Sequence, residues 1–316
     1  REQLEKEKKI YYQDKDLGEK EDKPIITLSP KQKDVNNCKS KKIEDCVYPC
    51  TKLNKKCIPI PKRSWLIFPT DGYDFKDLEK LYWGLCTHLG TGVTQNKEAG
   101  LIHYITDGKL APQQGARILG KPTPSALHVD LSDCVGLFCV RQAPDDPRSL
   151  AASSMTVYNE IPRQHPEYLP RLYEGFIWNR VDTYPNETPF SNFKVPAFSA
   201  AEGVVTCRFH PGWIRGGMKK AEQKLTEKEI EIFDFIAQTA IKNSFAFPLH
   251  TGDIAFFNNY TVFHGKEGYE PVEDEGKKRV LLRIWLDLPN VRPFADEGNV
   301  RYGVVRHGNM GWTAAE

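Results

Sequence analysis

The sequence contains no apolar run long enough to cross a membrane. Its longest apolar segments include VGLFCV and VLLRIWL, which fall far short of the ~20 residues that a membrane-spanning helix needs. The opening residues, REQLEKEKK, also lack the apolar stretch of a secretion signal. From these absences we expect a chain with no membrane partner and a cytoplasmic location.

The sequence also carries little net charge. Its 44 Lys and Arg residues are nearly balanced by 42 Asp and Glu residues, which gives a formal net charge of +2. This balance offers no electrostatic reason to expect nucleic acid as a partner. The G-x-S-x-G motif of α/β-hydrolases is absent as well, which disfavours serine hydrolysis.

The first 62 residues differ in kind from the rest. They hold 16 Lys and Arg residues against 11 Asp and Glu residues, have few large apolar side chains, and end in IPIPK. We therefore expect residues 1–62 to form a basic N-terminal extension and residues 63–316 to form a single domain.

Half of the eight cysteines lie in this extension, namely Cys38, Cys46, Cys50 and Cys57. Their spacing, C-x7-C-x3-C-x6-C, fits a zinc knuckle poorly, so reduced thiols are favoured over a zinc site or a disulfide pair. The other four lie among apolar neighbours and are expected to be buried thiols: Cys86, Cys134, Cys139 and Cys207.

Hydrophobic periodicity after residue 63 predicts a few helices. Residues 74–90 place apolar side chains at helical spacing and stop at a glycine, and residues 164–175 and 224–242 follow similar patterns. In the last of these, Thr226 and Glu229 form a capping-box signature.

Short β-branched and aromatic runs separated by turn residues make up most of the remaining sequence. They are LIHYI, ALHVDLS, VGLFCVRQA, VVTCRF, DIAFFNN, TVFHG and RVLLRIWLDL. Many short strands with few helices predict a mainly β fold with flanking helices and a double-stranded β-helix, or jelly-roll, core.

Within the ALHVDLS run, His128 and Asp130 are two residues apart. The period of two along a strand projects both side chains from one face, so that an imidazole and a carboxylate can bind one cation. His264, in TVFHG, is the best candidate for a third ligand. Two histidines and one carboxylate on one side of a metal suit non-haem Fe(II), because three adjacent coordination positions stay open.

Two arginines, Arg279 and Arg283, lie four residues apart in the otherwise apolar run after His264. Strand parity puts both on one face, and a guanidinium buried there needs an anionic partner. A dicarboxylate would supply one, since the planar fork of arginine binds a carboxylate in a fixed orientation.

Together these segments resemble the taurine dioxygenase/TfdA family of iron(II)- and 2-oxoglutarate-dependent oxygenases over roughly residues 65–290. The segments that carry the resemblance are HVD at 128–130 with the following GLFCVRQA, PLHTGDIAFFNNYTVFHG at 249–265, and KRVLLRIWL at 278–286. The resemblance implies an enzyme that uses Fe(II), 2-oxoglutarate and O2 to oxidise an unactivated C–H bond, releasing succinate and CO2. The outcome would be hydroxylation, desaturation or cyclisation.

The resemblance also implies roles for individual residues. His128, Asp130 and His264 would bind the iron, and Arg279 would anchor the distal carboxylate of 2-oxoglutarate. Ser149 matches the position of a hydroxyl residue that helps to hold that carboxylate, although APDDPRS replaces the Gly-Gly-containing turn usual before it. Arg283 matches a second arginine that faces the substrate or the co-substrate.

The substrate is expected to be a small molecule, a carboxylic acid or an amino acid, because Arg283 favours an anion. Further candidates for its pocket are His103, Tyr104, Phe138 and His210, each of which could equally serve the core or a structural hydrogen bond. The sequence leaves oligomerisation open. Two alternatives remain: a cupin-like zinc or manganese enzyme with the same ligands, which gives no reason for the two arginines, and a non-catalytic metal- or partner-binding protein.

Overall fold

The computed structural model describes residues 66–67, 70, 72–95, 100–109, 120–180, 188–191, 193–289, 293, 300–301 and 304–305. Contacts divide the chain into two units, Arg1–Ile67 and Phe68–Glu316. The short strand β1 (Leu66–Ile67) belongs to the first unit, and the other described strands and helices belong to the second. The predicted extension and its four cysteines lie outside the described residues, so the boundary after residue 62 stays a prediction.

The larger sheet of the second unit is built around two long apolar strands, β5 and β12. Its strands run in the order β10, β5, β12 and β2, β3 also pairs with β12, and all of these pairings are antiparallel. The strands are β2 (Thr91–Val93), β3 (Ile102–Ile105), β5 (Cys134–Arg141), β10 (Asp253–Asn258) and β12 (Val280–Asp287). Because β5 and β12 are covered on both faces, they are apolar along their length rather than alternating.

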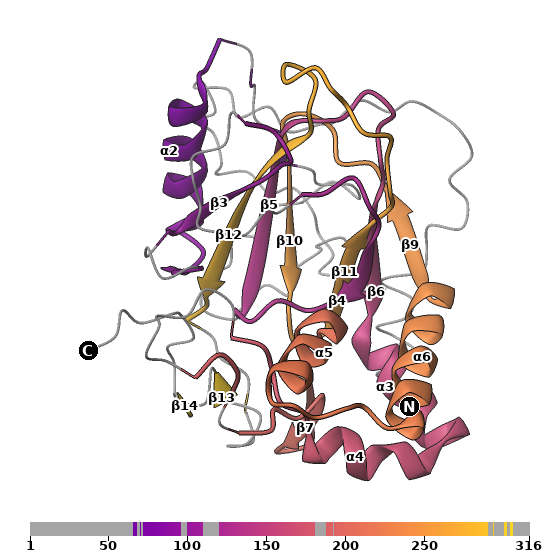
Figure 1. Ribbon diagram of the computed structural model, residues 1–316. Coiled ribbons are helices and arrows are strands. Elements are labelled where there is room, and N and C mark those ends of the chain that lie inside the picture. Colours follow the sequence, from indigo (N-terminus) through magenta and orange to yellow (C-terminus); the bar gives the residue numbers. More distant parts are fainter. Residues whose placement is uncertain are drawn as a thin grey trace, which may run out of the picture. The chain divides into compact units, whose positions relative to one another are not determined.

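The smaller sheet has the order β4, β11, β6 and β9 and is also antiparallel. Its strands are β4 (Ser125–His128), β6 (Ser149–Ser153), β9 (Ser244–Phe247) and β11 (Val262–Lys266). Two separate hairpins consist of β7 (Phe198–Ala201) with β8 (Val204–Cys207) and of β13 (Val300–Arg301) with β14 (Val304–Val305). The two main sheets make up the strand core of Figure 1, and two antiparallel sheets are what the predicted jelly roll requires.

Helix α2 (Phe75–Cys86) covers the outer face of the larger sheet, where Tyr82 packs against Phe138 of β5 with ring centroids 5.4 Å apart. Its N-cap is Asp74, whose side chain accepts a hydrogen bond from the Asp77 N–H, so the helix predicted over 74–90 begins as expected and ends earlier, at Cys86. At Gly136 of β5 a Cβ atom would lie 2.4 Å from the Tyr82 hydroxyl, so only glycine allows α2 to approach this closely.

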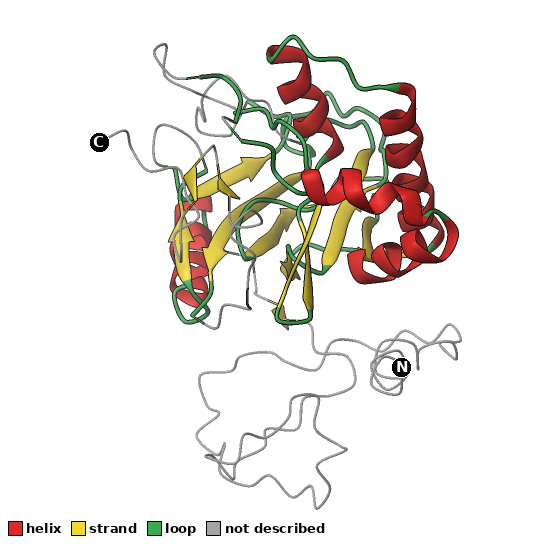
Figure 2. Cartoon of the chain, turned by 90° about the horizontal axis from the view of Figure 1, so that it is seen from below, coloured by secondary structure: helices red, strands yellow, loops and turns green. Residues whose placement is uncertain are grey.

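The remaining helices gather at the other side of the strands (Figures 1 and 2). They are α3 (Ser154–Gln164), the 3-10 helix η2 (Pro166–Tyr168), α4 (Leu169–Glu174), α5 (Pro211–Lys220) and α6 (Glu227–Lys242). Both α3 and α6 contact strands of the smaller sheet. The capping box of Thr226 and Glu229 is present, which confirms the predicted start of α6.

Three features differ from the sequence prediction. The helix expected over 164–175 is interrupted, because His165 has a non-helical backbone (φ −143°, ψ 64°) that separates α3 from η2 and α4. Helix α3 was not predicted. Helix α5 was not predicted either, and in it Gly217 lies so close to the backbone of residue 178 that a Cβ atom would be 2.3 Å from its carbonyl carbon. Glycine permits close packing here rather than a turn.

Cys86, Cys134, Cys139 and Cys207 are buried free thiols, as predicted. Among the helices of the described residues, none is both long enough and apolar enough to span a membrane.

Candidate metal centre

The structure brings His128, Asp130 and His264 together into one cluster, with one ligand atom from each within 4.8 Å of the others. His128 ends β4, Asp130 follows two residues later, and His264 lies in the middle of β11. His128 and His264 are register partners in the antiparallel pair of β4 and β11. Residues directly opposite one another project from the same face of a sheet, so strand pairing alone places the two imidazoles side by side.

The carboxylate of Asp130 lies between the two imidazoles. Its Oδ1 is 3.8 Å from Nε2 of His128, and its Oδ2 is 3.6 Å from Nε2 of His264. Asp130 and His264 are buried, with exposed fractions of 3% and 6%, and His128 is partly buried. Metal bonds of about 2.0–2.2 Å allow two ligands on one ion to be separated by these distances.

The other ring nitrogen of His128 fixes which tautomer faces the cluster. Nδ1 lies 2.6 Å from the carbonyl oxygen of Ala126, which can only accept a hydrogen bond, so Nδ1 carries the proton. Nε2 therefore directs a lone pair toward Asp130. Metal-ligating histidines are typically held this way, with the second nitrogen donating to a backbone carbonyl or carboxylate.

Two side chains of β12, Trp285 and Arg283, hold the Asp130 carboxylate from the larger sheet. The Trp285 indole Nε1 donates to Oδ2 at 2.9 Å, and Nη1 of Arg283 lies 3.5 Å from the same oxygen. Burial alone would raise the pKa of Asp130, but the positive charge of Arg283 and the adjacent imidazoles outweigh it and hold the pKa well below its usual value. The carboxylate is therefore ionised and ready to bind a cation.

This donor set fits iron(II). Two imidazole nitrogens and one carboxylate oxygen are the ligands of the facial arrangement in non-haem Fe(II) oxygenases, and His128, Asp130 and His264 would supply them. His264 is kept in place by stacking on Phe257, with ring centroids 5.3 Å apart and an interplanar angle of 20°.

The burial of His128 makes the stability of the metal-free protein depend on pH. Burial first, and the neighbouring His264 second, lower the pKa of His128 to about 4, whereas histidine in an unfolded chain titrates near 6.5. Between these values the unfolded chain binds a proton that the folded chain does not, so the free energy of unfolding falls as the pH drops from about 6.5 to about 4. We expect the thermal midpoint of the metal-free protein to fall across this window and to fall less in His128→Gln. An equal fall in both proteins would contradict this account.

The two arginines of the C-terminal strand region have different partners. Nε of Arg283 donates to Oε1 of Gln95 at 2.8 Å, and the same guanidinium faces Asp130. Arg279, only 2% exposed, donates through Nε to Oε1 of Gln142 at 2.8 Å, and within the described part of the chain no carboxylate oxygen lies within 4.0 Å of it. Arg279 is thus a buried cation paired with a neutral amide.

Ser149 and Lys266 lie near the same end of the smaller sheet. Ser149, the first residue of β6, is buried and is the register partner of Lys266 in β11. In the same ladder His264 pairs with Ala151, so Ser149, Lys266 and His264 project from one face. Burial first, and the positive charge of Arg279 second, lower the pKa of Lys266 to about 8. The positive charge of Arg279 therefore acts on Lys266, which lies beside Ser149.

The predicted substrate residues separate onto two faces of the larger sheet. His103 is the register partner of Arg283 and shares its face, whereas Tyr104 and Phe138 both pair with Leu282 and face α2. Because neighbouring strand residues point to opposite sides, His103 and Tyr104 cannot line the same pocket. Tyr104 and Phe138 belong to the core under α2 and do not line the site.

His210 lies beside the cluster. Its ring centroid is 4.3 Å from that of His128, and its Nδ1 accepts a hydrogen bond from the Trp213 N–H at 3.2 Å as the N-cap of α5. This bond leaves the proton of the neutral ring on Nε2. His210 therefore combines a structural role with a position next to a ligand.

Several residues that contact the cluster or the two arginines were not predicted from the sequence. Trp285 could have been found, because it is two residues from Arg283 and shares its strand face. Gln95 and Gln142 lie in segments with no signal that pointed to them, and the same holds for Asn259, whose side chain accepts the Asp130 N–H.

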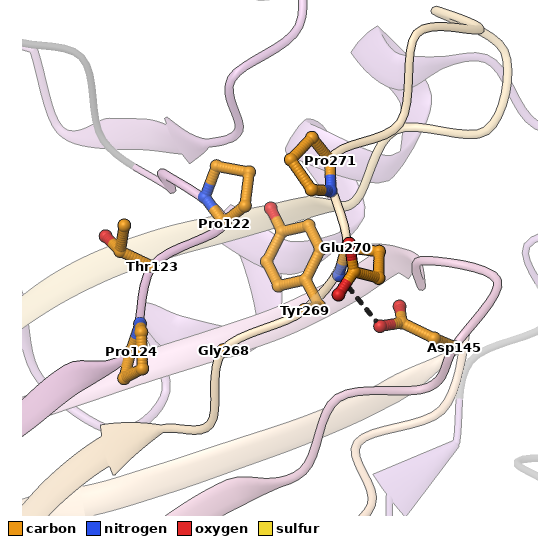
Figure 3. Close-up of a pocket in the computed structure, with 8 residues that line it drawn as sticks. All are labelled: Pro122, Thr123, Pro124, Asp145, Gly268, Tyr269, Glu270 and Pro271. Carbon is orange, nitrogen blue, oxygen red and sulfur yellow. Dashed lines mark hydrogen bonds between the residues drawn. The ribbon is translucent and has the colours of Figure 1, made fainter.

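A separate open hollow of about 440 Å³ is lined by Pro122, Thr123, Pro124, Asp145, Gly268, Tyr269, Glu270 and Pro271 (Figure 3). Its two acidic residues are linked by a hydrogen bond from the Glu270 N–H to Asp145 at 3.0 Å. None of the cluster residues line this hollow, and its negative charge is unsuited to a dicarboxylate. The buried positive charge of Arg279 suits a dicarboxylate better than this hollow does.

Comparison with known proteins agrees with this geometry. Residues 63–285 match the family described as "Taurine catabolism dioxygenase TauD, TfdA family". FR-33289 synthase from Streptomyces rubellomurinus is 28% identical over 235 residues, which cover 72% of this chain and 68% of that protein. Taurine hydroxylase-like protein SAT17 from Stachybotrys chartarum is 29% identical over 164 residues, covering 50% of this chain and 40% of that protein.

The structure of an asparagine oxygenase in complex with Fe(II), 2S,3S-3-hydroxyasparagine and succinate is similar to the present one, with a TM-score of 0.50. The sequences are 15% identical, and the likeness covers 65% of this chain and 63% of that chain, which is less than two thirds of its length. This likeness confirms the predicted fold class. Since the family match extends over residues 63–285, well over half of the sequence, the chain belongs to the TauD/TfdA family, a family of iron(II)- and 2-oxoglutarate-dependent oxygenases.

Proposed function

We propose that this chain is a 2-oxoglutarate-dependent oxygenase that oxidises an unactivated C–H bond of a small carboxylic or amino acid. The observation that carries the proposal is a buried His128, Asp130 and His264 cluster accompanied by Arg279, a buried cation with no carboxylate within 4.0 Å in the described residues. A metal cluster alone would suit many enzymes. A cluster with a nearby unneutralised guanidinium suits a metal chelator that carries a second carboxylate.

In this proposal His128, Asp130 and His264 hold iron(II), which together with 2-oxoglutarate and O2 supplies the oxidising power and releases succinate and CO2. The chain's own residues then have positioning tasks. Arg279 binds the distal carboxylate of 2-oxoglutarate, and the Gln142 amide fixes the orientation of the guanidinium by accepting from Nε. Ser149 contributes a hydroxyl to the same carboxylate, on the face that also carries His264.

The cationic surroundings support the binding of an anion there. Burial of Arg279 is unfavourable for its charge and lowers its pKa, and the nearby Lys266 is similarly affected. A carboxylate bound at Arg279 would offset both costs, because an opposite charge in a buried site stabilises the ionised forms. Neither zinc nor manganese chemistry on the same ligands requires these two cations.

The substrate side of the site contains Arg283 and His103, which share a strand face, and His210, which packs beside His128. Arg283 forms an ion pair with Asp130, which would also bind the metal. Because the metal would take part of the negative charge of Asp130, the guanidinium would still attract a substrate carboxylate. This favours a small acid or amino acid over a neutral lipid. The accuracy of this placement decides which hydrogen is removed, because a shift of about 1 Å at a reacting centre can cost about 100-fold in rate.

The test has two stages. First, the protein loaded with Mn(II), which is redox-inactive toward the co-substrate, is titrated with 2-oxoglutarate, and saturable binding that needs His264 is expected. Second, the iron-loaded protein is incubated in air with a panel of small carboxylic and amino acids, and succinate is measured. We expect one acid to stimulate succinate release, with a product that has gained one oxygen or lost two hydrogens. A metal-loaded protein that binds no 2-oxoglutarate would overturn the proposal.

A further inference from the structure

A buried amide lies between the two segments that carry the cluster. Asn259 is 1% exposed and lies in the turn between β10 and β11, five residues before His264. Its side chain reaches the loop after β4 that carries Asp130. It therefore joins two parts of the chain that are far apart in sequence and meet at the cluster.

Every polar atom of the Asn259 side chain is used in this connection. Oδ1 accepts the backbone N–H of Asp130 at 3.0 Å. Nδ2 donates to the carbonyl oxygen of Ser132 at 3.0 Å and to its hydroxyl at 3.2 Å. The backbone N–H of Asn259 also donates to the carbonyl of Asp133 at 3.0 Å. An amide, with an acceptor and two donors, is the side chain that can make this set.

Neighbouring contacts hold the rest of the same loop. The Tyr260 hydroxyl donates to Oδ1 of Asp133, whose Oδ2 accepts the Leu288 N–H at 2.7 Å. Nη1 of Arg208, a residue only 1% exposed, donates to the carbonyl of Leu131 at 2.8 Å. Several hydrogen bonds therefore hold the loop backbone in place. The position of that backbone, together with the contacts of the carboxylate itself, sets the direction of the Asp130 side chain.

We propose that Asn259 is a positioning residue of the metal centre: it fixes the Asp130 backbone relative to the strand of His264, so that carboxylate and imidazole meet at one ion. This inference rests on the proposed role of the cluster as the iron site. It assigns Asn259 no contact with the metal, the co-substrate or the substrate.

Removal of the amide would leave the Asp130 N–H and the Ser132 carbonyl buried without these partners, and buried polar groups without partners are unfavourable. The loop would then shift to find other partners and would carry Asp130 with it. Loss of a residue that orients a ligand typically weakens metal binding by about 10- to 100-fold. We expect a loss of this size for Asn259→Ala.

The adjacent residue provides a matched control. Asn258 is exposed, and its Oδ1 accepts the Tyr260 N–H at 2.9 Å without touching the Asp130 loop. Asn258→Ala removes an asparagine and one side-chain hydrogen bond from the same turn, so it reports the general cost of disturbing that turn.

The experiment titrates the full chain with Co(II), whose visible absorption depends on the geometry of its ligands, and records thermal melts of the metal-free proteins. Asn259→Ala is expected to bind Co(II) about 10- to 100-fold more weakly and, at saturation, to show a changed visible spectrum. Asn258→Ala should stay within about twofold of the original chain. If Asn259→Ala does not fold, Asn259→Asp takes its place; it keeps the acceptor for the Asp130 N–H but loses the bonds that Nδ2 donates to Ser132, so a smaller loss of Co(II) affinity with a changed visible spectrum is expected.

The outcomes separate the two proposals. If a folded Asn259 variant binds Co(II) as tightly as the original chain and with the same spectrum, while His264→Ala loses binding, the positioning role is wrong and the metal site stands. If the original chain binds no Co(II), the metal site is wrong, and the role of Asn259 falls with it.

Discussion

Replacing His264 by alanine is expected to abolish stoichiometric iron binding. In the proposed metal site His264 is one of three protein ligands, and its Nε2 lies 3.6 Å from the Asp130 carboxylate that would share the ion. Loss of a residue that merely supports a ligand already weakens metal binding by about 10- to 100-fold, so the loss of a ligand should exceed about 100-fold. His128→Ala, on the paired strand, should have the same effect. Anaerobic equilibrium dialysis with Fe(II) measures both.

His250→Ala is the matched control for these variants. His250 has a side chain that is 62% exposed and lies 3.7 Å from Asp146 at the surface. Its replacement removes a histidine from the same region of sequence without changing the cluster. Retention of one iron per chain by both His128→Ala and His264→Ala would show that the ion binds elsewhere.

The second large effect is expected for Arg279→Ala, which should raise the 2-oxoglutarate concentration needed for half-maximal succinate release by roughly 30- to 3000-fold. Truncation of one partner in a buried, hydrogen-bonded charge pair costs about 2–5 kcal/mol, and each 1.4 kcal/mol corresponds to about tenfold in affinity. In this variant the distal carboxylate would lose the guanidinium fork and keep the Ser149 hydroxyl and the Gln142 amide as neighbours. Iron binding should be unchanged, since Arg279 makes no contact with the cluster among the interactions of the described residues.

Arg148→Ala is the control for Arg279→Ala. Arg148 directly precedes Ser149, but its side chain is 56% exposed and pairs with Glu267 at 2.8 Å on the surface. It therefore tests whether any positive charge near this end of the sheet supports co-substrate binding. Arg279→Lys should fall between alanine and the original residue, because lysine keeps the charge without the planar fork. An unchanged 2-oxoglutarate requirement in Arg279→Ala would place the anchor at another residue.

The sequence predicted the cluster because the signals for it are local. His128 and Asp130 share a strand end, and period-two geometry predicts that they can reach one ion without knowledge of the fold. Which third residue joins them depends on strand pairing, and here the register of His264 opposite His128 brings them together. The sequence named His264 as the best candidate, and the family resemblance implied the same role for it, but neither gave this register.

The substrate residues were harder to predict because both faces of the larger sheet are buried. In a strand with one exposed face, alternation distinguishes inside from outside; β3 and β5 are covered by α2 on one side and by the site on the other, so the pattern disappears. Tyr104 and His103 therefore looked equally suitable, although adjacent residues must point in opposite directions.

Helix α5 shows a different limit. Pro211, Gly212, Gly216 and Gly217 all favour a loop when they are taken one at a time, and intrinsic propensity disfavours glycine in a helix by about 1 kcal/mol per residue. Tertiary packing overrides that preference, since Gly217 allows the helix to lie directly on the backbone of residues 177–179. Such a contact is between distant segments and leaves no local trace in the sequence.

The contact between Arg283 and Asp130 bears on how the enzyme is assembled in the cell. Before an ion arrives, the ligand carboxylate already has a guanidinium at 3.5 Å and an indole N–H at 2.9 Å, so the newly made chain is not left with an isolated negative charge in its interior. The polypeptide can therefore reach its native packing first and acquire iron afterwards. Iron supply would then limit how much of the protein is active, without limiting how much of it survives.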